Sequence, residues 1–254
     1  MPPTLEVLFT PAEFATLPQR DLSATVCVVF DVLRATSSIV TALANGATAV
    51  IPVAEIPEAL ALKQARPELL LAGEREGVRI RADLTGGVEF DLGNSPREFT
   101  RAQVGGRTIV LTTTNGSRAL RACVGARAVL ASSFLNLRAT TEHLQSLPPA
   151  NLLLVCSGTF DQAAFEDVLG AGALADLLWN GFAGNAASDS ARMARQIYLQ
   201  HRDDLTGAME DSRNGRRLLG NPDLRDDVAW CLRRDVFRLV AKLENDCIVP
   251  VNRL

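Results

Sequence analysis

The sequence predicts an α/β protein with a largely parallel sheet and a helical C-terminal third. Two observations support this fold class. Continuous apolar runs rich in β-branched residues, such as residues 26–30, are typical of strands buried on both faces. Several of these runs are followed by a polar turn and then by apolar residues at helical spacing. Each such segment ends at a glycine, as at Gly46 and Gly125, which is typical of a helix C-terminus. Alternation of strand and helix is typical of a parallel sheet with helical crossovers.

The unit around which the chain is organised combines a strand, a turn, a helix and a second strand. Residues 26–30 form the first strand, which ends at the carboxylate of Asp31. Helical spacing then covers residues 37–45, and the next strand covers residues 47–53. Ligands bind outside the carboxyl ends of strands in open parallel sheets, so we expect Asp31 and Arg34 to lie at a functional site.

The other elements follow from apolar runs and from the prolines and glycines between them. Pro57 begins a helix and Pro67 ends it, while Ser95 and Glu98 have the spacing of a capping box. The polar segment 76–94 has no clear periodicity and is too long for an ordinary connection. We expect strands over residues 5–9, 69–72, 107–111, 126–131, 152–155, 237–243 and 247–251, and helices over residues 57–66, 118–124, 137–147, 165–179, 188–207, 211–219 and 222–234.

A Gly- and Ala-rich stretch, residues 181–187, suggests a division of the chain. Residues 1–180 are expected to form an α/β core that carries most of the site. Residues 181–254 are expected to form a mostly helical part with two short strands, and whether this part is a subdomain of the same unit stays open.

Composition excludes several classes of function. The net charge of −3 argues against non-specific nucleic-acid binding, and no apolar run reaches the roughly 18 residues of a membrane span. We see no signal peptide, and five cysteines without a close pair fit a reducing compartment, so a cytoplasmic protein is expected. Two histidines in charged, helical surroundings make His-based catalysis improbable. A homodimer is one open option for its assembly.

Four predicted strand ends carry polar clusters that could bind a small anionic, phosphorylated substrate. The turn after residue 111 opens a helix, so its free N–H groups and hydroxyls are typical of an anion site, and each arginine could bind a phosphate or sulfonate through two hydrogen bonds. The candidates for this role are Arg34, Arg75, Thr112, Thr113, Thr114, Asn115, Gly116, Ser157 and Gly158.

Carboxylates near the same strand ends suit Mg²⁺, which prefers hard oxygen ligands together with phosphate and water. The candidate ligands are Asp31, Glu74, Asp91, Glu166 and Asp167. Asp31 stands out because a carboxylate directly after five buried apolar residues is costly unless it is paired or used. Each of the others also has a simpler interpretation as a solvated ion pair or a helix-terminal charge. Asp31, Arg34 and Cys156 are the catalytic candidates. The simpler interpretation of Cys156 is a small core residue.

Seven segments together resemble the 2-phosphosulfolactate phosphatase family, in the right order and over most of the chain. They are DVLRATSSIVTALANGA from Asp31, GER from Gly73, FDLGNSPREF from Phe90, LTTTNGSRAL from Leu111, SSFLN from Ser132, CSGT from Cys156 and FEDVLGAGAL from Phe165. Asn94 and Ser95 of the third segment join the candidates for substrate binding. This sequence departs from the family pattern at residues 77–89, which are longer and carry Gly86 and Gly87.

The resemblance implies a three-layer α/β/α fold and a Mg²⁺-dependent phosphatase. The implied reaction converts (2R)-2-phospho-3-sulfolactate to (2R)-3-sulfolactate and phosphate, a step of coenzyme M biosynthesis. Asp31 would be the nucleophile or a Mg²⁺ ligand. A dehalogenase-type phosphatase needs a second Asp two positions later, where this chain has Leu33, so metal ligation is favoured.

Two other functions fit parts of the same pattern. An isochorismatase-like cysteine hydrolase would use Asp31 as base and Cys156 as nucleophile, but it would need a lysine between them, and Lys63 lies on a predicted helix. A non-catalytic protein that binds small anions would use the same turn without chemistry.

Overall fold

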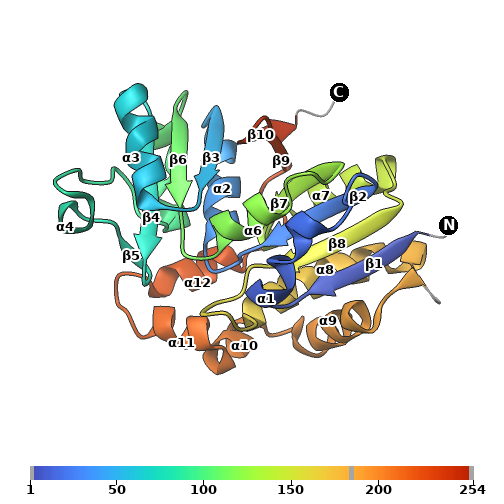
Figure 1. Ribbon diagram of the computed structural model, residues 1–254. Coiled ribbons are helices and arrows are strands. Elements are labelled where there is room, and N and C mark those ends of the chain that lie inside the picture. Colours follow the sequence, from blue (N-terminus) through green and yellow to red (C-terminus); the bar gives the residue numbers. More distant parts are fainter. Residues whose placement is uncertain (1–2, 183–185, 252–254) are drawn as a thin grey trace.

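A computed structural model describes residues 3–182 and 186–251 of the chain (Figure 1). Within these residues, ten strands form a sheet in the order β1-β8-β2-β7-β9-β10-β3-β6-β4-β5. The strands are β1 (Thr4–Leu8), β2 (Thr25–Phe30), β3 (Ala49–Val53), β4 (Leu70–Arg75), β5 (Val78–Arg79), β6 (Thr108–Thr112), β7 (Ala128–Ser132), β8 (Asn151–Cys156), β9 (Val240–Glu244) and β10 (Cys247–Val251).

Helices cover the sheet and fill most of the C-terminal third. They are α1 (Pro11–Phe14), α2 (Ala35–Ala44), α3 (Ile56–Ala65), α4 (Ala82–Thr85), α5 (Arg101–Val104), α6 (Gly116–Ala122), α7 (Leu137–Ser146), α8 (Phe165–Phe182), α9 (Asp189–His201), α10 (Leu205–Asp211), α11 (Arg213–Leu219) and α12 (Arg225–Cys231). Short 3₁₀ turns lie at Leu17–Gln19, Pro96–Glu98 and Phe134–Asn136. Among the described residues, no helix has the length and apolar character needed to cross a membrane.

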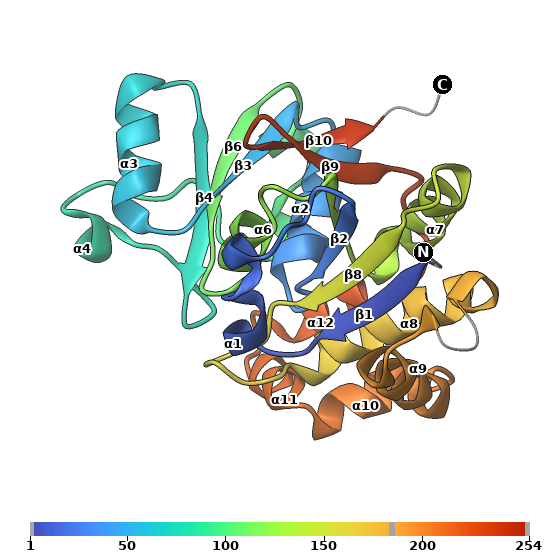
Figure 2. The same cartoon turned by 45° about the vertical axis from the view of Figure 1, so that its right-hand side comes forward.

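Alternating side chains of β2 show why helices lie on both faces of the sheet. Val28 and Phe30 are fully buried in the apolar cluster that includes α8. Cys27 and Val29 point to the opposite face and are buried in the cluster that includes α1 and α6. Because successive side chains of a strand alternate between faces, a strand that is apolar throughout needs a helix layer on each side. The expected three-layer α/β/α fold is therefore confirmed (Figure 2).

Two groups of parallel strands make up most of the sheet. β1, β8, β2 and β7 are parallel to their neighbours, and so are β3, β6 and β4. The antiparallel hairpin β9–β10 joins the groups by pairing with β7 and with β3. The last strands of the chain thus lie in the middle of the sheet, with Ala241 and Ile248 fully buried. The carboxyl ends of β2, β4, β6 and β8 meet at one pocket.

Several expected boundaries differ from the structure. The capping box at Ser95 is wrong, because the Ser95 hydroxyl donates to Asp227 and makes no capping bond. The expected helix over residues 188–207 is split into α9 and α10, and the expected strand over residues 237–243 begins only at Val240. Of the expected linker 181–187, residues 183–185 lie outside the described residues, and Ala187 forms a parallel bridge with Leu5.

Candidate active site

A pocket of about 300 Å³ lies where strand ends β2, β4, β6 and β8 meet helices α8 and α11. Both acidic and basic side chains line the pocket. This mixture suits an anionic ligand that is bound by a metal cation and by arginines together. Five carboxylates and three arginines line it, namely Asp31, Glu74, Glu76, Glu166, Asp167, Arg34, Arg75 and Arg217.

Asp31 follows β2 directly and lines this pocket, beside the first turn of α2. Its Oδ1 accepts a hydrogen bond from the backbone N–H of Ala35 at 3.0 Å. A Cβ atom on Gly116 would lie 2.6 Å from Asp31 Oδ2, so only glycine lets α6 approach the carboxylate this closely. Burial raises the pKa of Asp31, and the N–H of Ala35 opposes that shift.

Asp167 joins the first turn of α8 to two strand ends. Its Oδ1 accepts from the backbone N–H of Val32 at 2.8 Å, and its Oδ2 accepts from the N–H of Gly158 at 3.1 Å and the hydroxyl of Ser157 at 3.2 Å. Burial and then the charge of Asp31 raise the pKa of Asp167 well above its usual range. The donors nonetheless favour the ionised form, so the carboxylate is positioned as well as buried.

Among residues 3–182 and 186–251, three buried oxygen atoms at the pocket have no hydrogen-bond partner. They are Glu166 Oε2, Asn214 Oδ1 and Asn94 Oδ1, and all three of these residues line the pocket. The orientation of Asn214 is set by its amide nitrogen, which donates to Glu166 Oε1 at 2.5 Å and to the Thr159 hydroxyl at 2.7 Å. Burial raises the pKa of Glu166. Unpartnered buried oxygens are costly, and a cation would satisfy them.

Glu74 occupies the turn that the sequence suggested as an anion site. Its Oε1 accepts from the backbone N–H of Thr114 at 2.8 Å and from the Thr114 hydroxyl at 2.9 Å. Its Oε2 accepts from the N–H of Gly77 at 2.6 Å. A carboxylate of the protein therefore already uses the donors of this turn, and Glu74 ties the β4–β5 hairpin to the start of α6.

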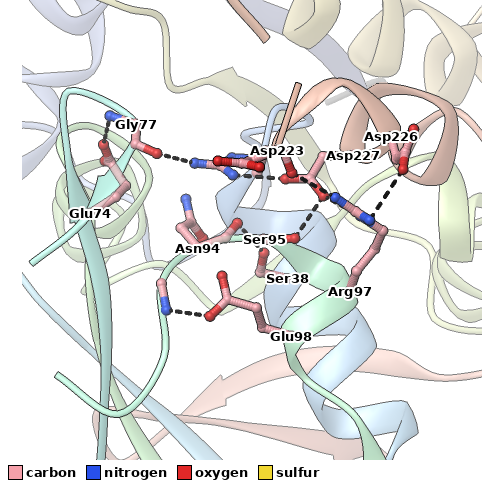
Figure 3. Close-up of polar contacts among 12 residues, drawn as sticks. Ser38, Glu74, Gly77, Asn94, Ser95, Arg97, Glu98, Asp223, Asp226 and Asp227 are labelled. Carbon is pink, nitrogen blue, oxygen red and sulfur yellow. Dashed lines mark hydrogen bonds and ion pairs between the residues drawn. The ribbon is translucent and has the colours of Figure 1, made fainter. Parts of the chain in front are cut away.

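Arg34 is held by a buried ion pair with Asp227, whose contacts with Ser95 and Arg97 are visible in Figure 3. Its Nη1 donates to Asp227 Oδ2 at 2.7 Å and its Nη2 donates to the Gly77 carbonyl at 2.7 Å. Asp227 Oδ1 accepts from the Ser95 hydroxyl at 2.6 Å and from Arg97 Nε at 2.7 Å. A guanidinium has five N–H donors, so Arg34 keeps donors for the pocket that it lines.

Arg75 is positioned by β6 and by its own strand. Its Nη2 donates to the Thr112 hydroxyl at 3.1 Å, and its Nη1 donates to the Glu74 carbonyl at 2.7 Å. Thr112 and Thr113 are buried and do not line the pocket, and Thr113 bonds to Ser117. Of the predicted substrate-binding residues, the pocket brings together Arg34, Arg75, Asn94, Thr114, Asn115 and Gly158.

Some predicted residues lie outside the pocket. Cys156 is fully buried, and burial followed by the charge of Asp167 raises the pKa of its thiol well above the usual value. Asp91 is exposed, and its Oδ2 accepts from the N–H of Leu71 at 2.7 Å. Ser95 and Ser157 are buried and do not line the pocket. Their hydroxyls donate to Asp227 and Asp167, respectively.

Helix α11 supplies residues that the sequence analysis missed. Asn214 and Arg217 are three positions apart, so they share one helix face and both line the pocket. Phe160 and Thr159, which follow β8, line it as well. The spacing of Asn214 and Arg217 was visible in the sequence, but nothing indicated that this helix returns to the strand ends.

The oxygen-rich end of the pocket has the ligand types that Mg²⁺ uses. Asp31, Glu166 and Asp167 meet there, and the unpartnered oxygens of Asn214 and Glu166 add to them. Within the described residues, no group of three or more His, Cys, Asp or Glu side chains is arranged to hold an ion by itself. Mg²⁺ usually takes one or two carboxylates and completes its shell with water and substrate phosphate, so this arrangement fits it.

Comparison with known proteins gives one consistent family. A family model described as 2-phosphosulpholactate phosphatase matches residues 12–246. A probable 2-phosphosulfolactate phosphatase of Thermotoga petrophila is 38% identical over 91% of this chain and 95% of the relative. Proteins with the same name from Caldanaerobacter subterraneus and Clostridium acetobutylicum are 37% and 33% identical, over 92% and 86% of this chain and 94% and 89% of the relatives.

Proposed function

The chain belongs to the 2-phosphosulpholactate phosphatase family, and from this membership and the pocket we propose that it hydrolyses a small phosphate monoester with the help of Mg²⁺. The proposed substrate is (2R)-2-phospho-3-sulfolactate, and the products are (2R)-3-sulfolactate and phosphate. The pathway would then be coenzyme M biosynthesis. All five cysteines are free thiols, which is consistent with action in the reducing cytoplasm.

The observation that carries the proposal is the cluster of buried oxygens at one end of the pocket. Asp31, Glu166 and Asp167 repel one another and would repel a phosphate, so a cation among them would favour the binding of a phosphorylated acid. The same oxygens fit Mg²⁺, and the arginines next to them fit phosphate oxygens. Mg²⁺ bound there would neutralise charge on the phosphoryl group.

The residues of the chain then have separate tasks. Asp31, Glu166 and the amide oxygen of Asn214 hold the cation, and Asp167 fixes the strand ends that carry the site. Arg34 and Arg75 donate to phosphoryl oxygens, where charge develops as the ester bond breaks. Because their guanidinium groups are already fixed by Asp227, Glu74 and Thr112, little reorganisation is needed when the substrate arrives.

Asp31 acts as a metal ligand in this proposal rather than as a nucleophile. A nucleophilic aspartate needs a nearby acid to protonate the leaving oxygen, and the residue two positions later is the buried Leu33. The cysteine-hydrolase alternative has less support, because a fully buried thiol with a raised pKa is a poor nucleophile.

The test is a panel of small phosphorylated acids, assayed for phosphate release with Mg²⁺, without it, and after EDTA. We expect turnover of 2-phosphosulfolactate that EDTA abolishes and added Mg²⁺ restores. Turnover that survives EDTA would contradict the metal dependence. Substrate binding without any phosphate release would favour the non-catalytic alternative.

A further inference from the structure

We propose that Arg217 of α11 binds the sulfonate of the substrate and thereby selects sulfonated phosphoacids over unsulfonated ones. This inference rests on the proposed function and adds a specificity residue to it. The substrate carries three anionic groups, a phosphate, a carboxylate and a sulfonate. Each needs a separate partner if the enzyme is to distinguish it from simpler phosphoacids.

Arg217 is the arginine of the pocket whose donors are least used. Arg34 is bonded to Asp227 and Gly77, and Arg75 is bonded to Glu74 and Thr112. Arg217 is exposed at the pocket rim, and among the described residues its guanidinium has no hydrogen-bond or ion-pair partner. Arg213, one turn earlier in α11, is used by Gln162 and the Thr159 carbonyl.

Charge distribution sets the direction in which the substrate lies. The buried carboxylates Glu166 and Asp167 lie with the half-buried Asp31 at the cation end, which takes the phosphate together with Mg²⁺. A sulfonate coordinates Mg²⁺ weakly and stays fully ionised, so it is better placed away from these carboxylates. Arg217 offers a planar pair of donors to three equivalent sulfonate oxygens.

The β4–β5 hairpin lies against this arginine at Gly77. A Cβ atom on Gly77 would lie 3.6 Å from the Arg217 Cζ, and Gly77 has a φ of +83° that other residues adopt only with strain. The same glycine bonds to Arg34 through its carbonyl. Glu76 is exposed at the same rim, where its negative charge would weaken the binding of an anion. It forms no ion pair with Arg217, so the guanidinium keeps its donors for a ligand.

The experiment compares two substrates that differ only in the sulfonate, 2-phosphosulfolactate and 2-phospholactate. We expect Arg217→Ala to raise KM for 2-phosphosulfolactate by about 10- to 150-fold, the range for a charge-assisted hydrogen bond, and to change kcat less than threefold. KM for 2-phospholactate should stay the same. Arg217→Lys should lie between, because it keeps the charge and loses the planar donor pair.

Arg216→Ala is the matched control, because Arg216 is the neighbouring exposed arginine and bonds to the Asp211 carbonyl outside the pocket. It should leave both substrates unchanged. Equal effects of Arg217→Ala on both substrates, or equal effects of the two variants, would overturn the assignment. Calorimetry with 3-sulfolactate and lactate tests the sulfonate site without turnover. A chain that hydrolyses neither substrate would refute the proposed function. Loss of 3-sulfolactate binding in Arg217→Ala would still support the sulfonate site in that case.

Discussion

At the scale of single residues, the position of a side chain along a strand was more informative than its type. Asp31 could be selected from the sequence because it follows five apolar residues, and the structure places it in the pocket. Asp91 has the same side chain, yet it is exposed and only accepts the N–H of Leu71. A carboxylate that lines a pocket at the end of a buried strand is therefore the stronger candidate for a site.

Asp31→Asn should abolish phosphate release and leave the protein folded. The change removes a charge that holds the cation in the proposed function, while Asn keeps an oxygen to accept the N–H of Ala35. Since burial raises the pKa of Asp31, removal of its charge should not destabilise the metal-free protein. Phosphate release and thermal melting, both measured on the same preparation, check this. Retained turnover with a large loss of stability would show that Asp31 is structural.

Partners that come from distant parts of the chain could not be predicted. The sequence places Arg34 at a strand end, but its partner Asp227 is 193 residues away. Likewise, the turn around Thr114 has the composition of an anion site, and nothing in its composition shows that Glu74 fills it. Such pairings depend on how elements pack, which local patterns do not encode.

At the scale of elements, α12 and the 3₁₀ turn Pro96–Glu98 form a support behind the pocket. Asp227 of α12 is fully buried and accepts from Arg34, Ser95 and Arg97. Its partner Arg34 is also buried, with a side chain that is 3% exposed. This pairing explains the failure of the expected capping box, because the Ser95 hydroxyl is directed to Asp227 rather than to its own helix.

Asp227→Asn should lower the free energy of unfolding by about 3–5 kcal/mol, the usual effect of removing one partner of a buried ion pair. It leaves the buried Arg34 charge uncompensated and places an amide donor against other donors. Urea denaturation measures the change. Asp226→Asn is the matched control, because Asp226 has a side chain 68% exposed and lies 3.4 Å from Arg97; it should change stability by less than about 1 kcal/mol. Equal losses in both variants would contradict the role of Asp227.

At the scale of the whole molecule, the order of strands in the sheet could not be predicted from the sequence. The buried strands and their helices were predicted because their patterns are local, and the α/β class followed from them. The C-terminal hairpin was expected as two short strands of a helical part, but it lies between β7 and β3. The helices α11 and α12, which precede this hairpin, likewise lie against strand ends from the first half of the chain.

The carboxylate cluster should make the stability of the whole molecule depend on pH and, in the proposed function, on Mg²⁺. Burial raises the pKa values of Asp31, Glu166 and Asp167 above those of an unfolded chain, which lie near 4. Above about pH 4 the folded state therefore binds more protons than the unfolded state, and this contribution to stability is lost as pH rises through the raised values. In the proposed function Mg²⁺ would offset this loss, because it would bind the ionised carboxylates and compete with protons.

We expect Mg²⁺ to raise Tm more at pH 8 than at pH 5, measured against EDTA at matched ionic strength. At about 100 times Kd the stabilisation is about 2.7 kcal/mol, which corresponds to roughly 5–10 °C for a chain of this size. Glu166→Gln keeps an oxygen for Asn214 and removes one charge beside Asp31 and Asp167. In EDTA at pH 8 this variant should melt above the unmodified protein, and Mg²⁺ should no longer shift it. The same Mg²⁺ response at both pH values, or in both proteins, would mean that the cation binds elsewhere.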